Sequence, residues 1–356
     1  MLINKKNTIH IFFLALFIIL AFLLILYLVI GPVQININQS TEIILSYFKL
    51  ISEENISFNQ IQKMVLLDIR IPRLILAILV GAGLGMSGAI LQGLFRNPLI
   101  DPGFIGVSSG AAVGALFAIM FSQFFYFYFD TNISNFLLPI LAMSGSFITT
   151  FIIYRISKSA YKTNIMTMLL AGIAVNALSG SIIGLFINFT SDLELRSFTF
   201  WTLGGLDTAD WQVVSIVALF ILSSIIFIYS IRNKLDIFML GDAQAHHLGV
   251  NVESLKKKII LFSAIIVGIS VAFCGMIGFI GLVTPHLIRL FIGPKHKYLI
   301  PGSALLGSII LVISDLISKT IISPAQLPIG VITSLIGAPF FIFLILKQKN
   351  KIGYAE

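Results

Sequence analysis

A long uncharged run that ends in prolines constrains this chain most. Between Arg73 and Arg96 lie more than twenty residues without a charged side chain, and a helix rising about 1.5 Å per residue crosses the ~30 Å hydrocarbon core of a membrane over that length. Its second half is rich in glycine and alanine, which let helices approach closely in lipid. Pro98 and Pro102 then stop the helix, because proline has no amide donor. The run predicts a buried membrane span followed by a polar elbow.

The composition extends this reading to the whole chain. Of 356 residues, 58% are hydrophobic and 11% are charged, against roughly 25% charged in soluble domains. The chain is therefore expected to be an integral membrane protein, and its net charge of +8 is read as membrane topology rather than as a nucleic-acid surface. The single cysteine, Cys274, excludes an internal disulfide and a thiolate metal cluster, and is expected to be a small buried residue.

Apolar runs separated by charged breaks predict an all-α membrane protein, with about ten transmembrane helices in one compact bundle over residues 1–356. The predicted crossings are 10–31, 65–94, 104–122, 136–155, 165–188, 211–231, 258–276, 278–292, 300–320 and 328–346. The first run is expected to be a retained span, since it is too long for a signal-peptide core and lacks a small-residue cleavage site. The crossing at 278–292 is short, and the glycines around its start mark a turn or a kink.

The distribution of basic residues predicts the orientation. If the N-terminus is cytoplasmic, 17 of the 23 Lys and Arg residues fall on the cytoplasmic side, so both termini are expected to be inside. The segment 33–62 reads as an external loop that carries a helix on the membrane surface.

The longest inner loop, residues 232–258, contains a candidate docking helix. Asp242 is expected to cap this helix, and Gly249 to end it in the left-handed conformation, which leaves about two turns. Such a short helix is marginal alone, so its loop or a partner must hold it. Two interpretations stay open: an ordinary capped loop, or a knob that docks into a cleft of a soluble protein.

Neither a nucleotide site nor a metal site is predicted. The sequence contains no Gly-x-x-x-x-Gly-Lys-Ser/Thr phosphate loop, so ATP is expected to bind another polypeptide. His246 and His247 point to different faces of a helix, and no cysteine or acidic pair completes a ligand set around them. We expect no cofactor on this chain.

Arg70 and Arg73 stand out as basic residues on the outer side. They begin the second span and lie three residues apart, near one helix face. Interfacial snorkelling would explain them. The alternative is a cationic socket for acidic side chains of an extracytoplasmic binding protein, which would favour rapid association and correct register.

Asp315 lies within the ninth predicted span, where an isolated carboxylate is costly. It is read as a paired structural group, with Lys319 one turn later as its natural partner. The alternative is a proton or ion site, which would make the chain a secondary transporter. A membrane-embedded enzyme would need clustered His, Asp or Glu at depth, and no such cluster is visible.

Two further groups of polar and small residues could belong to the transport path. The first group shares a glycine-rich helix face and suits either the pathway or helix packing: Gly81, Gly85, Gly88, Gln92 and Asn176. The second group shares the elbows at the inner face and suits gating, capping of carbonyls or contact with a partner: Arg96, Asn97, Pro98, Pro285, His286 and Arg289.

These motifs together resemble the FecCD family, the permease subunits of binding-protein-dependent ABC importers for ferric siderophores, haem or cobalamin. The motifs that carry the resemblance are spread over nearly the whole chain: Arg-Ile-Pro-Arg at 70–73, Gln92, Arg-Asn-Pro-Leu at 96–99, Leu-Gly-Asp at 240–242, Leu-Gly-Val at 248–250, Gly-Phe-Ile-Gly-Leu-Val-Thr-Pro-His at 278–286, Leu-Pro-Ile-Gly at 327–330 and Gly-Ala-Pro at 337–339.

The resemblance implies a type II importer permease in a bacterial cytoplasmic membrane, with no bond chemistry of its own. It implies a homodimer with the path at its two-fold axis, two cytosolic ATPase subunits that carry ATP and magnesium, and an extracytoplasmic substrate-binding protein. The segment at about 240–250 would be the coupling helix that engages the ATPase, through Leu240, Gly241, Asp242, Ala243, Ala245, Leu248 and Gly249.

The resemblance also assigns a docking role to three cations, Arg70, Arg73 and Lys319, which would receive glutamates of the binding protein. Two positions depart from the family pattern. Lys319 stands where arginine is usual, which removes bidentate geometry, and Gln326 stands where many relatives have glutamate. The sequence does not specify which cargo is carried.

Overall fold

The computed structural model describes residues 2–51, 57–128, 131–159, 162–323 and 325–352. Within these ranges, seven helices are long and apolar enough to cross a membrane, and three shorter apolar helices accompany them. The predicted all-α membrane fold with about ten crossings is confirmed.

The helices that span the bundle follow the predicted order. The long ones are α1 (Leu2–Val29), α4 (Ile71–Phe95), α7 (Thr131–Ser157), α8 (Ile165–Ile187), α10 (Trp211–Ser230), α13 (Val252–Cys274) and α15 (His296–Thr320). The others are α5 (Val107–Met120), α14 (Ile280–Ile292) and α16 (Ile329–Ile352). A helix α3 (Gln60–Met64) and a π-helical turn η2 (Val65–Arg70) lead directly into α4.

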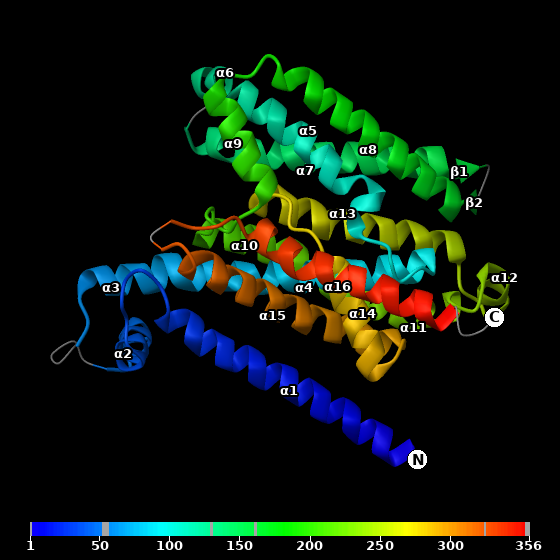
Figure 1. The fold of residues 1–356 in the computed structure, drawn as a ribbon, viewed down its shortest axis with the longest axis horizontal. Coiled ribbons are helices and arrows are strands. Elements are labelled where there is room, and N and C mark those ends of the chain that lie inside the picture. The colour runs from blue at the N-terminus through cyan, green and yellow to red at the C-terminus, as the bar shows by residue number, and fades with distance from the viewer. Residues whose placement is uncertain (1, 52–56, 129–130, 160–161, 324, 353–356) are drawn as a thin grey trace.

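Short elements decorate both ends of the bundle (Figure 1). At one end lie α2 (Ile37–Tyr47), α3, α6 (Ser122–Tyr128) and α9 (Asp192–Leu203); we call this the α9 end. At the other lie α11 (Arg232–Phe238), α12 (Asp242–His247) and the antiparallel hairpin of β1 (Lys158–Ser159) and β2 (Lys162–Thr163); we call this the α12 end. Helix α1 begins at the α12 end, and α16 runs back to it.

Helix α4 forms the core of the bundle. Nearly all of its side chains are buried, and it packs against α15, α14, α13 and α10. Figure 1 shows α1 along one edge of the bundle and α5, α7 and α8 along the opposite edge. The helices approach closely because glycine has no Cβ. A Cβ added at Gly81 would overlap the carbonyl oxygen of Gly307, and one added at Gly88 would overlap that of Gly281. The glycine-rich face predicted for the second span is therefore a packing face.

Two breaks that glycine and proline predict position the neighbouring helices. Helix α4 ends at Phe95, and Arg96 takes the left-handed conformation (φ 49°) before Pro98. Between α13 and α14, residues 275–279 form a turn rather than a kink, with Gly275 and Phe279 both at positive φ. This turn explains why α14 is short.

Candidate functional site

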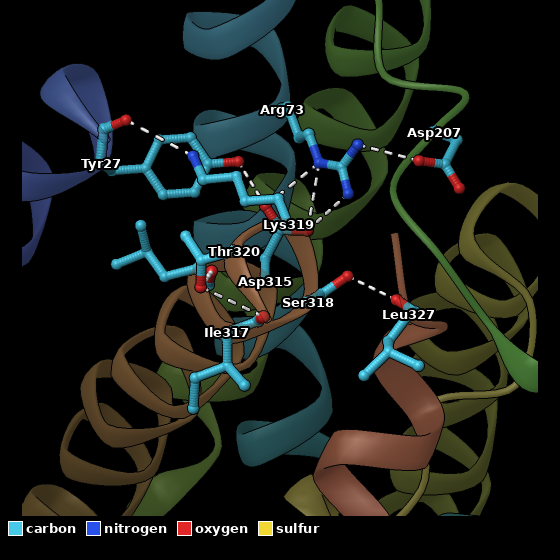
Figure 2. Close-up of polar contacts among 10 residues, drawn as sticks. Tyr27, Arg73, Asp207, Asp315, Ile317, Ser318, Lys319, Thr320 and Leu327 are labelled. Carbon is cyan, nitrogen blue, oxygen red and sulfur yellow. Dashed lines mark hydrogen bonds and ion pairs between the residues drawn. The ribbon is translucent and has the colours of Figure 1, made fainter. Parts of the chain in front are cut away.

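The first candidate site lies at the α9 end, around Arg73. The Nε of Arg73 donates to both carboxylate oxygens of Asp315 at 3.1 Å, and its Nη2 donates to Oδ1 at 2.7 Å. Its Nη1 reaches Oδ1 of Asp207 at 2.8 Å (Figure 2). The Asp315 side chain is fully buried, whereas that of Asp207 is 71% exposed. One guanidinium therefore links an interior carboxylate to one at the surface.

Among the described residues, the other hydrogen-bond partner of Asp315 is Tyr27 and not the lysine one turn later. The hydroxyl of Tyr27 donates to Oδ2 of Asp315. The ammonium of Lys319 instead lies 3.3 Å from the centre of the Tyr27 ring and 3.5 Å from its backbone oxygen (Figure 2). The predicted Asp315–Lys319 pair is thus wrong, because the fork of Arg73 takes the carboxylate.

The structure confirms that Asp315 is a paired structural group. Its carboxylate accepts hydrogen bonds from Arg73 and Tyr27 and is shielded from solvent. A buried carboxylate held in this way does not resemble an open ion site. The alternative of an ion-coupled transporter therefore finds no support.

Arg70 turns inward at the same end. From the last residue of η2, its guanidinium donates to the carbonyls of Leu28, Val29 and Val33. Leu28 and Val29 are in the last turn of α1, where carbonyls lack intrahelical partners. Arg70 therefore caps α1, and the side chain is neither snorkelling nor free at the surface.

The three predicted docking cations are brought together, but beneath the surface. Arg70, Arg73 and Lys319 are each less than a tenth exposed. Asp207, which is exposed, pairs with Arg73, and it borders a cavity of about 210 Å³ that Gln326 also lines. The loop that carries Gln326 is held by Ser318, whose hydroxyl donates to the carbonyl of Leu327 (Figure 2). The docking role of the cations stays a prediction.

The second candidate site is α12, at the opposite end. The predicted two-turn helix is present, and Gly249 follows it in the left-handed conformation (φ 80°). Of its own residues only Ala245 is buried, and the apolar side chains of Leu240 and Leu248 beside it are about 60% exposed. The helix itself exposes mainly polar side chains, and the two exposed leucines flank it, next to a hollow of about 940 Å³.

Asp242 does not cap α12, contrary to the prediction. Gly241 occupies the N-cap position, and Asp242 is the first helical residue. Its carboxylate instead binds Nη2 of Arg96 and Nζ of Lys256. Partial burial raises the pKa of the Asp242 carboxyl, but the hydrogen bonds from Lys256 and Arg96 outweigh it and hold this pKa below its usual value.

Four of the six predicted elbow residues gather around one cavity at the α12 end. Arg96, Asn97, Pro98 and Arg289 line a cavity of about 430 Å³ together with Gln92. Nη2 of Arg289 donates to Oε1 of Gln92 at 3.0 Å, while the amide nitrogen of Gln92 donates to the carbonyls of two neighbouring segments. Gln92 thus ties α4 to α14, and its side chain is buried; a role in the path stays a prediction.

The other predicted path and gate residues separate. Gly81, Gly85 and Gly88 pack against backbone of α15 and α14. Asn176 instead lines an open cavity of about 460 Å³ with Ser109 and Asp101, and its side chain bonds Ser109 and the carbonyl of Gly103. Pro285 is buried within α14, and His286 is half-buried and faces the Phe340 ring edge-on.

Sequence reasoning missed Lys256, Asp207 and Tyr27. For Lys256 a signal was present: it shares a helix face with Val252, Ile259 and Ser263, whereas Lys257 and Lys258 point outward. Asp207 and Tyr27 had no such signal, because their partners are more than a hundred residues away in the chain.

Comparisons with known proteins place this architecture. A profile described as the FecCD transport family matches residues 19–347. The chain is 42% identical over 307 residues to the hemin transport system permease protein HmuU of Yersinia pestis, covering 83% of this chain and 87% of that protein. It is 37% identical over 281 residues to the vitamin B12 import system permease protein BtuC of Salmonella paratyphi A, covering 79% and 83%.

A solved structure shares the fold. It is described as an inward-facing conformation of a metal-chelate type ABC transporter, and it matches 95% of this chain and 99% of its own with a TM-score of 0.79 and 30% identity. The similarity therefore extends over the bundle and both of its ends.

Proposed function

The chain belongs to the FecCD transport family, and from this premise we propose that it is the membrane-spanning subunit of an ATP-driven importer in a bacterial cytoplasmic membrane. It is a multi-pass membrane permease of the ABC importer type. We propose that a separate ATPase subunit hydrolyses ATP, that a binding protein delivers the cargo, and that the α12 end faces the cytosol with both termini.

The observation that carries the proposal is α12 itself. A helix of six residues is not stable by itself in water. Helix α12 is nevertheless exposed except at Ala245, and two charged contacts through Asp242 hold it in place. The apolar side chains of Leu240 and Leu248 are left uncovered. A short exposed helix that is anchored at its start and flanked by two uncovered leucines suits insertion into a cleft of the ATPase.

We propose a binding-protein contact at the α9 end. Arg73 pairs with both Asp315 and Asp207. Arg70 contacts backbone carbonyls and Lys319 contacts Tyr27, so three cations stand beside two carboxylates and the cluster attracts acidic side chains of the partner. Access to Arg73 runs past Asp207, since the rest of the guanidinium is occupied by Asp315.

A second copy of the chain is proposed to pack along α8. A Cβ added to Gly180 or Gly184 of α8 would meet no neighbouring segment within 4 Å, and Leu178 and Leu185 are about 60% exposed. This face also carries Asn176 and its cavity, so two copies that meet here would enclose a polar path between them. The proposed cargo is a metal chelate of the haem, ferric siderophore or cobalamin class, as supported by the relatives.

Substitution on α12 tests the proposal. Ala243 is exposed and Ala245 is buried, so Ala243→Trp alters the surface of α12 without disturbing its packing. We expect a tagged wild-type chain to co-purify with an ATPase, the Ala243→Trp variant to lose it, and the Ala243→Ser control to retain it. Retention of a fully active ATPase by Ala243→Trp would reject the docking role.

The cargo is tested on the assembled complex. Hemin, a ferric siderophore and cobalamin are each supplied with the binding protein, and ATP hydrolysis is measured. We expect one of the three to stimulate hydrolysis above the level of the empty binding protein. Equal rates with all three and with none would contradict the cargo class.

A further inference from the structure

The carboxylate of Asp242 attaches α12 to two helices, α4 and α13. One oxygen binds Arg96, at the end of α4, and the other binds Nζ of Lys256 in α13 at 2.9 Å. The Arg96 guanidinium also donates to the carbonyl of Phe238 and lies 4.2 Å from the centre of its ring. The first link therefore leads to the tightly packed core helix of the bundle.

The second link leads elsewhere. Lys256 is only 3% exposed, and its ammonium donates to three acceptors: Asp242, Oε1 of Glu253 at 3.1 Å and the carbonyl of Thr163 at 3.0 Å. An ammonium has three N–H donors, so Lys256 uses all of them. Oε2 of Glu253 in turn accepts the amide of Thr163 at 2.8 Å. Both backbone groups of Thr163 are thus held at this point.

Thr163 stands next to the start of α8. It is the last residue of β2, and Asn164 after it caps α8, accepting the amide of Thr167 at 3.1 Å. Unlike α4, α8 is largely uncovered in the monomer. A chain of contacts therefore runs from α12 through Lys256 and Thr163 to α8, which borders the Asn176 cavity.

We propose that Lys256 is a positioning residue that transmits displacement of α12 to α8, and thereby couples nucleotide use to the width of the path. The inference rests on the proposed function of α12. Separating a buried, fully hydrogen-bonded ammonium from its carboxylates is costly, so α12 and β2 move together. Helix α4 is confined by helices of its own chain on several sides, whereas α8 is largely uncovered by its own chain, so its movement would alter the proposed contact with the second copy.

Contact alone does not establish coupling, so the test compares two adjacent lysines. The assembled complex in proteoliposomes is assayed for cargo moved per ATP hydrolysed, with Lys256→Met and, as a matched control, the exposed Lys257→Met. We expect about a tenfold fall in this ratio for Lys256→Met, none for Lys257→Met, and recovery of most of it in Lys256→Arg. A wild-type ratio in Lys256→Met would overturn the inference.

A second readout follows α8 directly. A spin label at Met166→Cys, a position in α8 that is 67% exposed, reports the distance between the two copies. We expect ATP to change this distance in the wild type and in Lys257→Met but not in Lys256→Met, although hydrolysis continues. An unchanged ATP response in Lys256→Met would contradict the inference.

Two outcomes separate the inference from its premise. If the wild type fails to assemble with an ATPase, the proposed function is rejected, and the inference about Lys256 is rejected with it. If only Lys256→Met fails to assemble, the comparison moves to Glu253→Gln, which weakens the hold on Lys256 and Thr163. About a two- to fivefold fall in cargo per ATP is then expected, and a wild-type ratio would overturn the inference.

Discussion

Arg73 holds the buried carboxylate of Asp315 with two of its nitrogens, across a separation of 242 residues in the sequence. This contact joins α4 to α15 inside the membrane span, where a charge that loses its partner is costly. We predict that Asp315→Asn destabilises the bundle by about 3–5 kcal/mol, measured as a lower unfolding temperature in detergent. The double variant Arg73→Met with Asp315→Leu is expected to regain part of the loss; no regain would contradict a charge-pair explanation.

The contact of Arg73 with Asp207 has a different consequence. Because Asp207 is mostly exposed, the pair is worth about 0.2–1 kcal/mol, and Asp207→Asn should leave stability nearly unchanged. It should also free Nη1 of Arg73 for an acidic partner. We predict about two- to fivefold tighter association of the binding protein, measured by titration in detergent.

A matched variant controls the Asp207 prediction. Asp192→Asn removes another exposed carboxylate at the same end, in the first turn of α9, and is expected to leave affinity unchanged at physiological salt. Weaker association of Asp207→Asn would show that Asp207 assists docking rather than competing for Arg73.

Packing of α4 on α14 requires a glycine at position 88. A methyl group there would overlap the backbone of Gly281, whereas a methyl group at Gly180 on α8 would meet no neighbouring segment within 4 Å. We predict that Gly88→Ala lowers the free energy of unfolding by about 1–3 kcal/mol, while Gly180→Ala is neutral or slightly stabilising in the monomer. Thermal unfolding of both variants in detergent checks this, and equal stability would contradict the packing.

The hold on α12 is predicted to be insensitive to mild acid. The pKa of Asp242 is lowered in the folded protein, so its contribution is present above the ordinary carboxyl pKa of about 3.9 and is lost as pH falls through the lower folded value. A spin label at Ala243→Cys should keep constant mobility from pH 8 to 5 and loosen below about pH 4. Loosening between pH 7 and 5 would contradict this assignment.

The sequence was most informative where the signal was local. Uncharged runs located the spans, and the Leu-Gly-Asp and Leu-Gly-Val motifs set the limits of α12. The role predicted for Asp242 is wrong, because a local rule favours capping while its actual partners, Arg96 and Lys256, come from distant segments.

Long-range pairing was the part that sequence reasoning could not reach. Lys319 is the nearest cation to Asp315 along the helix, yet tertiary packing brings Arg73 and Tyr27 to that carboxylate. In the sequence, Lys256 and its neighbours Lys257 and Lys258 serve only as evidence for membrane orientation. Its position on the apolar face of α13 nevertheless distinguishes Lys256 from them. Asp207 lies in a connection between helices, where periodicity gives no information.

Uptake by reconstituted vesicles tests the central claim most directly. Proteoliposomes containing the chain with its ATPase are given the loaded binding protein and ATP, and parallel vesicles containing the chain alone are given proton and sodium gradients. The account predicts uptake only when ATPase and ATP are both present. Uptake by the chain alone, driven by an ion gradient, would contradict it.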